Sequence, residues 1–224
     1  MNIENRQKGI KQLAVIAMFC AIAFVCMLVI KIPVQFLTLD IKDSVIILCG
    51  LLFGPLSALA ISIIVPLLEL GLGLSGTGYY GLIMNILSSL SFSLVASIIY
   101  KYKKTLYGAI VGLISGVLAM TAVMMIANLL ITPYYMGAPT AAVAALIPKL
   151  LLPFNLVKAV LNAAIVLLLY KPISKILKKL GIIGLSNRIV MNNTKTKTRN
   201  IVITSIAAAI IVLSLLIIFF VLKA

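Results

Sequence analysis

The sequence predicts an all-α, polytopic integral membrane protein: a bundle of six helices followed by a seventh transmembrane helix. Of its 224 residues, 63% are hydrophobic and only 10% are charged. A soluble protein of this size has no core large enough to bury so much apolar surface. The long apolar runs lack the two-residue alternation of barrel strands, so we expect helices to satisfy the backbone polar groups within the bilayer.

Six apolar runs divide the chain. They cover residues 13–30, 44–70, 80–99, 106–131, 145–170 and 201–222. Each is long enough to approach a hydrocarbon core of about 30 Å as a helix. The first run follows a basic segment, as in a signal peptide, but it continues into Lys31 without a small-x-small cleavage site. We therefore expect it to be a retained first helix.

The second run is interrupted at Gly54-Pro55. Proline lacks a backbone donor and disfavours a helical preceding residue, so this point is either a kink or a turn between two helices. Two helices place Lys101, Lys103 and Lys104 on the same side as the basic N-terminus, and the positive-inside rule favours that arrangement. The first half, Ser44 to Phe53, is only about 15 Å long as a helix, so we expect a pocket above it.

This topology gives three parts: a six-helix membrane domain in residues 1–180, a basic polar cytoplasmic linker in 181–200 and the additional helix in 201–224. The protein is expected in the cell membrane as a multi-pass protein with its N-terminus in the cytoplasm. Most of the 19 basic residues then lie inside. Because they sit in short clusters between apolar runs, they indicate topology and contact with lipid, and no nucleic acid partner is expected.

The chain lacks the usual side chains of catalytic and metal sites. Histidine is absent, and the four acidic residues are scattered as Glu4, Asp40, Asp43 and Glu69. The three cysteines, Cys20, Cys26 and Cys49, have no ligand-like spacing and are expected to be small buried hydrophobes. We expect no catalytic residue, metal or cofactor. A Walker A motif is missing, so any ATP dependence would come from another polypeptide.

Three polar residues, Asn128, Asn155 and Lys158, stand within apolar runs. Polar groups at membrane depth are costly unless they face a partner, a cavity or a ligand. Asn155 and Lys158 are three residues apart and share a helix face, and Pro153 would loosen the helix at the same level. They are candidate ligand contacts. The alternative is that the asparagines join helices while Lys158 extends toward water.

Two loops and one helix face add further candidates. Residues 36–40 and 75–81 lie on the same side under this topology and would form a lid, and Glu69 beside them is either a solvated helix end or a ligand contact. In the first helix, Ala14, Ala17 and Ala21 form a stripe of small residues. Such a stripe lets another helix approach closely, either within the bundle or in a separate partner.

Several short motifs together resemble the substrate-binding S components of energy-coupling factor vitamin transporters, in particular the riboflavin transporter family. The resemblance covers roughly residues 10–180. The motifs that carry it are Ala17-x-x-x-Ala21, Leu37-Thr-Leu-Asp40, Phe53-Gly-Pro55, Met84-Asn85, Asn128 followed by Thr132-Pro-Tyr-Tyr135, and Pro153-Phe-Asn-Leu-Val-Lys158. The chain departs from the family at Asp43-Ser-Val45, where Asp-x-Pro is common, and in its seventh helix.

The resemblance implies a vitamin-capturing subunit that docks through the alanine stripe on a transmembrane coupling subunit driven by two ATPase subunits. Riboflavin would be the transported ligand. Its expected contacts are Thr38, Leu39, Asp40, Gly81, Asn85, Asn128, Asn155 and Lys158. Two alternatives stay open: another vitamin or flavin mononucleotide, attracted by Lys31, Lys42 or Lys149, and a membrane scaffold whose polar residues only join helices.

Overall fold

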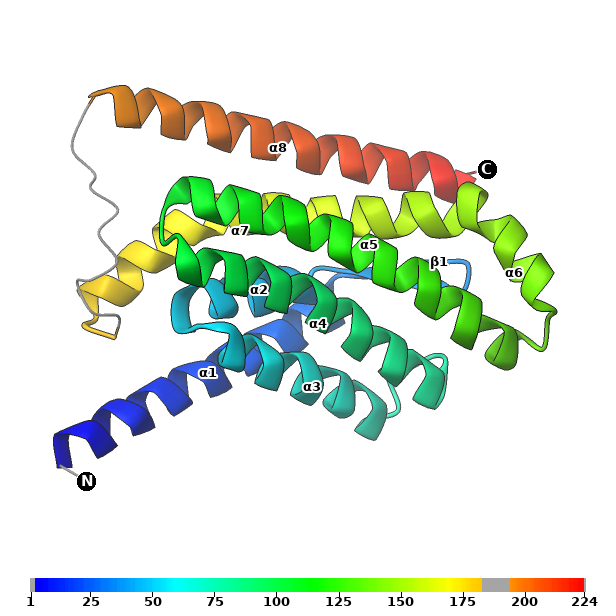
Figure 1. Cartoon of the computed structure of the whole chain (residues 1–224), viewed down its shortest axis with the longest axis horizontal. Coiled ribbons are helices and arrows are strands. Elements are labelled where there is room, and N and C mark those ends of the chain that lie inside the picture. Colours follow the sequence, from blue (N-terminus) through cyan, green and yellow to red (C-terminus); the bar gives the residue numbers. More distant parts are fainter. Residues whose placement is uncertain (1–2, 183–193, 224) are drawn as a thin grey trace.

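Helices account for nearly all of the chain in the computed structural model, which describes residues 3–182 and 194–223, with side chains for 9–182 and 202–217. The helices are α1 (Ile3–Val29), α2 (Lys42–Phe53), α3 (Pro55–Gly71), α4 (Gly78–Tyr102), α5 (Leu106–Met136), α6 (Thr140–Leu146), α7 (Leu152–Lys179) and α8 (Thr194–Lys223). They form an elongated bundle (Figure 1).

Four helical segments in the described part are long and apolar enough to cross a membrane: Gly9–Val29, Gly78–Tyr102, Leu106–Met136 and Thr140–Lys179. Shorter apolar helices cover Pro55–Gly71 and Val202–Ile217. This confirms the predicted class of a polytopic helical membrane protein.

The break at Gly54-Pro55 is a turn between two helices, as charge parity predicted. Helix α2 ends at Phe53, Gly54 adopts φ 101°, and Pro55 opens α3. Glycine has no Cβ and tolerates this positive φ, while proline suits the first helical turn because its missing N–H would be unpaired there. The turn lies at the same end of the bundle as the N-terminus and the α4–α5 connection (Figure 1).

The segment between α1 and α2 is a β-hairpin, where the sequence suggested an open loop. Strand β1 (Lys31–Val34) pairs antiparallel with β2 (Leu37–Asp40), so that Lys31 lies opposite Asp40 and Val34 opposite Leu37. Backbone polar groups removed from water need partners, and strand pairing supplies them here. Leu39 and Val34 are buried in an apolar cluster with residues of α7.

The last helix of the predicted six-helix domain is longer than expected and changes its winding. Helix α6 runs into a π-helical turn, η1 (Ile147–Leu151), and then into α7, where the N–H of Leu152 donates to the carbonyl of Ile147. Pro148 directly follows the acceptor residue of this bond and Pro153 directly follows the donor residue. The loosening expected near Pro153 thus takes the form of a π-bulge, a feature that is frequent at functional sites.

Helices α4 and α5 approach closely because glycines of α5 face α4. A Cβ at Gly112 would lie 2.7 Å from the carbonyl oxygen of Ala96, and one at Gly116 would lie 2.6 Å from the ring of Phe92. Helices in lipid associate through such packing contacts, so small residues one turn apart stabilise the pair. This places α4 and α5 as two adjoining walls of the bundle.

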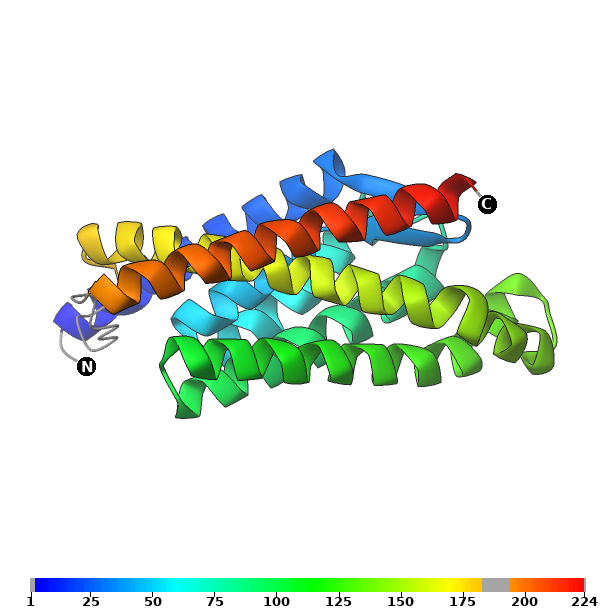
Figure 2. The same cartoon turned by 90° about the horizontal axis from the view of Figure 1, so that it is seen from above.

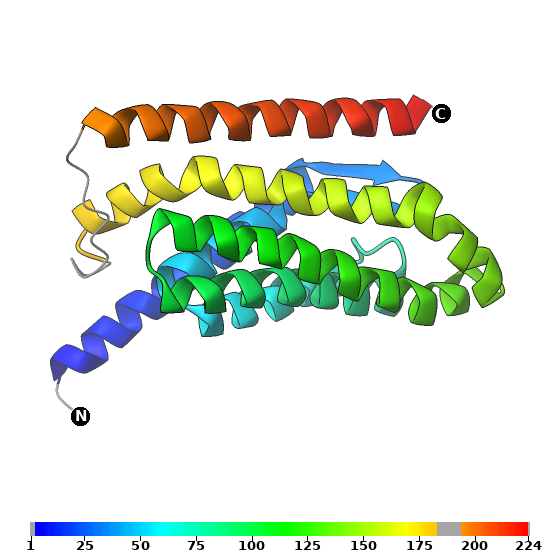
Figure 3. The same cartoon turned by 45° about the horizontal axis from the view of Figure 1, so that its top comes forward.

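Helix α8 lies along the outer side of α7 (Figures 1 and 3) and overlies it in the turned view of Figure 2. It begins at Thr194, seven residues before the expected start at Ile201, because its polar first turns continue the helix beyond the apolar stretch. Residues 183–193 of the expected linker lie outside the described residues. Ala207 and Ser214 are buried, and Ile211 packs on the apolar cluster that holds Val34 and Leu39.

A candidate ligand cavity

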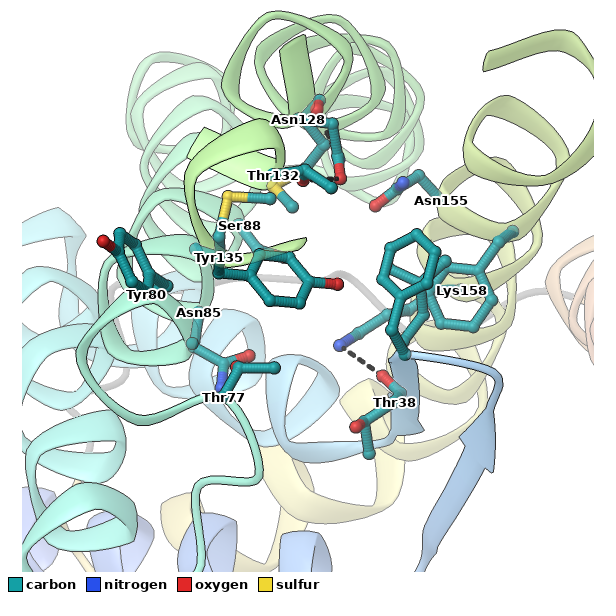
Figure 4. Close-up of a pocket in the computed structure, with 16 residues that line it drawn as sticks. Thr38, Thr77, Tyr80, Asn85, Ser88, Asn128, Thr132, Tyr135, Asn155 and Lys158 are labelled. Carbon is teal, nitrogen blue, oxygen red and sulfur yellow. Dashed lines mark hydrogen bonds between the residues drawn. The ribbon is translucent and has the colours of Figure 1, made fainter. Parts of the chain in front are cut away.

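A cavity opens at the end of the bundle that carries the hairpin (Figure 4). The space between its lining atoms amounts to about 630 Å³, which includes the open mouth. It is bounded by the hairpin, by α4 with the connection before it, by α5 and by α7. The lining residues are Phe36, Leu37, Thr38, Thr77, Tyr80, Gly81, Met84, Asn85, Ser88, Met124, Asn128, Thr132, Tyr135, Phe154, Asn155 and Lys158.

Aromatic rings and two methionines form the apolar part of the lining. The ring centroids of Phe36 and Tyr135 lie 5.9 Å apart, and those of Tyr80 and Tyr135 lie 6.3 Å apart. Met84 and Met124 line the same cavity. Such walls suit a ligand with a flat, largely apolar ring system.

Two hydroxyl groups at the cavity have no protein partner. The oxygens of Ser88 and Tyr135 are buried and make no hydrogen bond, and Figure 4 shows the Tyr135 hydroxyl pointing into the cavity. Buried polar atoms are nearly always paired, so these two call for a ligand or water. Neither residue was among the ligand contacts expected from the sequence, although Tyr135 ends one of the motifs that carry the family resemblance. Helical spacing could have identified both, because residues three apart share a helix face. Ser88 follows Asn85 by three residues, and Tyr135 follows Thr132 by three.

Asn128 and Asn155 are buried in the walls, and each bonds mainly within its own helix. Nδ2 of Asn128 donates to the carbonyl of Met124 at 2.7 Å, and Nδ2 of Asn155 donates to that of Leu151 at 2.8 Å. The hydroxyl of Thr132 donates to Oδ1 of Asn128 at 2.9 Å. In Figure 4 the oxygen of Asn155 faces the cavity. Neither amide joins two helices among the described residues, which argues against a purely packing role.

Lys158 has a carboxylate partner, which the sequence analysis did not predict. Its Nζ lies 2.9 Å from Oδ2 of Asp40 and donates to the carbonyl of Thr38 at 3.3 Å. The side chain is buried, so the alternative in which it extends toward water is wrong. Two of its three N–H donors have protein partners, and the third remains available to the cavity.

The same carboxylate begins a chain of buried polar contacts. Lys42 donates to Oδ2 of Asp40 at 2.9 Å and to Oδ1 of Asn85 at 3.2 Å. Nδ2 of Asn85 donates to Glu69 at 3.0 Å, and Glu69 pairs with Lys31 at 3.2 Å. Glu69 is therefore neither a solvated helix end nor part of the lining. The chain connects β1, β2, α2, α3, α4 and, through Lys158, α7.

Asp40 is ionised in this arrangement. Its side chain is only 2% exposed, and burial alone would raise its pKa. The ammonium groups of Lys158 and Lys42 outweigh burial and hold the pKa of this carboxyl well below its usual range. Two cations therefore share one buried anion.

Most residues predicted to contact a ligand meet at the cavity. Its lining includes Thr38, Gly81, Asn85, Asn128, Asn155 and Lys158, whereas Leu39 is buried in the apolar cluster between the hairpin and α7, and Asp40 lies behind Lys158. Residues 36–38 and Thr77, Tyr80 and Gly81 line one space, so the two segments suggested as a lid do come together. Ala14, Ala17 and Ala21 lie on the exposed side of α1, away from its buried residues Phe19 and Ala23.

A largely helical membrane bundle with a polar and aromatic cavity at one end defines a ligand-binding membrane protein. The chain belongs to the ECF transporter substrate-specific component family, whose model matches residues 11–170. This membership confirms the predicted family. It also confirms that the protein is a transport component and not an enzyme. Helix α8 lies beyond the matched residues.

Two relatives support this assignment. The riboflavin transporter RibU of Staphylococcus aureus (strain TCH60) is 33% identical over 186 residues, which cover 79% of this chain and 96% of that protein. A solved S component of a bacterial ECF transporter matches with a TM-score of 0.64 and 31% identity over 75% of this chain and 98% of that one.

Proposed function

We propose that this chain is the riboflavin-binding S component of an energy-coupling factor uptake transporter. The observation that carries the proposal is the cavity itself, in which aromatic and methionine walls adjoin three amides and two unpartnered hydroxyls. Riboflavin combines a flat ring system, an imide edge and a polyhydroxylated chain, and each of these has a counterpart in the lining.

The polar lining suggests specific roles. An asparagine amide offers a donor and an acceptor side by side, so Asn155 and Asn128 suit the imide edge of the flavin. The remaining N–H of Lys158 would donate to a ring carbonyl or a ribityl oxygen. Ser88, Tyr135 and Thr38 would serve further ligand oxygens. Leu39 and Asp40 would not contact the ligand. Leu39 would hold the hairpin against α7, and Asp40 would position Lys158.

The topology and partners follow from the same proposal. The cavity end faces the outside of the cell membrane and the N-terminus lies in the cytoplasm, in keeping with the basic clusters near the opposite end. The alanine stripe on α1 docks on a transmembrane coupling subunit, and two ATPase subunits supply the energy. An exposed stripe of small residues suits such docking because it lets a partner helix approach closely.

The alternatives have less support. Flavin mononucleotide would need free cations, but Lys31 and Lys42 are paired with Glu69 and Asp40. Lys149 lines a different, mainly apolar hollow beside Val34 and Ile217. A scaffold would have no need for unpartnered hydroxyls around a cavity.

Titration of riboflavin with the detergent-purified protein tests the proposal. We expect quenching of flavin fluorescence with saturation at one ligand per chain, and no displacement of the bound riboflavin by unrelated vitamins. A preparation that is colourless and leaves added riboflavin fluorescence unchanged would reject the proposal. Co-purification with a coupling subunit and ATPases tests the assembly separately.

A further inference from the structure

We propose that Asp40 sets the charge of the cavity wall and thereby makes the site select neutral riboflavin over its 5′-phosphate. The inference rests on the proposed function and assigns to Asp40 a positioning and selectivity role in place of direct ligand contact. It concerns a residue that lies outside the lining, behind Lys158.

The contacts of Asp40 place it between two cations. Its Oδ2 accepts from Lys158 at 2.9 Å and from Lys42 at 2.9 Å. Lys158 lines the cavity, and Lys42 holds the side chain of Asn85, which also lines it. Without this carboxylate, two ammonium groups would stand at or directly behind one wall with no carboxylate in ion-pair contact, and only Asp43 and Glu69 would act on them from farther away.

Among the described residues, Asp40 is the acid in ion-pair contact with Lys158 and Lys42, whereas Asp43 interacts with the two lysines only beyond ion-pair distance. Asp43 accepts a hydrogen bond from Ser89 at 2.5 Å and makes no ion pair with a lysine in the described part of the chain. Glu69 is paired with Lys31 and bonded to Asn85. The backbone carbonyl of Asp40 is fixed by Asn162 at 3.1 Å, which holds the strand end beside α7.

A phosphate in this cavity would meet a cation that is already paired and a carboxylate directly behind it. Charges at a buried site interact much more strongly than in water. The wall therefore offers Lys158 as a hydrogen-bond donor to neutral oxygens but little net attraction for a dianion. Riboflavin, which carries no charge, pays no such penalty.

Asp40→Asn keeps the size of the side chain and removes its charge, so it frees the positive charge of Lys158. We expect the ratio of affinities, riboflavin 5′-phosphate over riboflavin, to rise by about tenfold or more, with the gain shrinking as salt is added. Fluorescence quenching in detergent measures both dissociation constants. The matched control is Glu69→Gln, which removes a carboxylate that belongs to the same polar chain but pairs with Lys31 instead of Lys158 or Lys42, and it should change the ratio by less than about threefold.

A second variant keeps the inference testable if Asp40→Asn does not fold. Lys158→Met removes the cation and leaves Asp40 paired with Lys42, so the affinity ratio should fall below that of the wild type. An unchanged or raised ratio in Lys158→Met, an unchanged ratio in Asp40→Asn, or an equal rise in Glu69→Gln would overturn the inference while leaving riboflavin binding intact. Absence of riboflavin binding in the wild type would instead overturn the proposed function itself.

Discussion

The ammonium group of Lys158 lies 2.9 Å from the carboxylate of Asp40, although 118 residues separate them in the chain. This ion pair joins strand β2 to helix α7, and Lys42 at the start of α2 donates to the same oxygen. Removing one partner of a buried pair leaves the other charge uncompensated, at a cost of roughly 3–5 kcal/mol. The carboxylate of Asp40 therefore joins strand β2 to helices α2 and α7 at the wall of the cavity.

Replacing Asn155 with alanine should weaken riboflavin binding by roughly 10- to 100-fold, because a buried hydrogen-bonding group of the ligand would lose its partner at about 1–3 kcal/mol. Fluorescence quenching of the purified protein measures the change. The matched control is Leu156→Ala on the next, exposed position, which should leave affinity within about twofold. Equal losses in both variants would mean that Asn155 acts only through helix packing.

Tyr135→Phe removes only a hydroxyl that has no partner in the protein. The ligand-free protein should therefore be as stable as the wild type or slightly more so, while riboflavin affinity falls by about three- to tenfold. Thermal unfolding and ligand titration separate the two effects. Tyr134→Phe is the control, because Tyr134 is 77% exposed. A loss of stability without a loss of affinity in Tyr135→Phe would show that the hydroxyl does not contact the ligand.

Ala17→Trp should abolish co-purification of the coupling subunit while leaving riboflavin binding intact, because the bulky ring prevents close approach to the exposed alanine stripe of α1. The control is Ile22→Trp, which places the same ring on another exposed side of α1. Retention of the partner by Ala17→Trp, or its loss from both variants, would remove the stripe as the docking surface.

Ala207→Leu should loosen α8 from α7. Ala207 is 1% exposed, and extra methyl groups at a packed position typically cost about 1–3 kcal/mol. The neighbouring Ala208 is exposed, so Ala208→Leu should have little effect. Thermal unfolding in detergent compares the two variants. If both unfold at the wild-type temperature, the contact between α8 and α7 contributes nothing measurable to stability.

The turn at Gly54-Pro55 could be predicted from local features of the sequence. The proline and the distribution of lysines predicted a turn there, and α2 and α3 meet at that point. The hairpin at residues 31–40 was not predicted, because its short strands alternate weakly and depend on pairing with each other. The other residues that line the cavity with the hairpin come mainly from α4, α5 and α7, which are distant from it in the sequence.

The sequence by itself determined the membrane class, the main helices and the polar residues of α5 and α7 that stand out against apolar neighbours. Placing polar groups in hydrocarbon costs free energy, and the composition of each segment shows whether it can meet that cost. These features can therefore be predicted segment by segment. Only the tertiary structure decided that Asp40 serves both Lys158 and Lys42, that Glu69 serves Lys31, and that Ser88 and Tyr135 face the cavity without partners. Hydrogen bonds and ion pairs act over about 3 Å, so which groups pair depends on how distant segments come together in space.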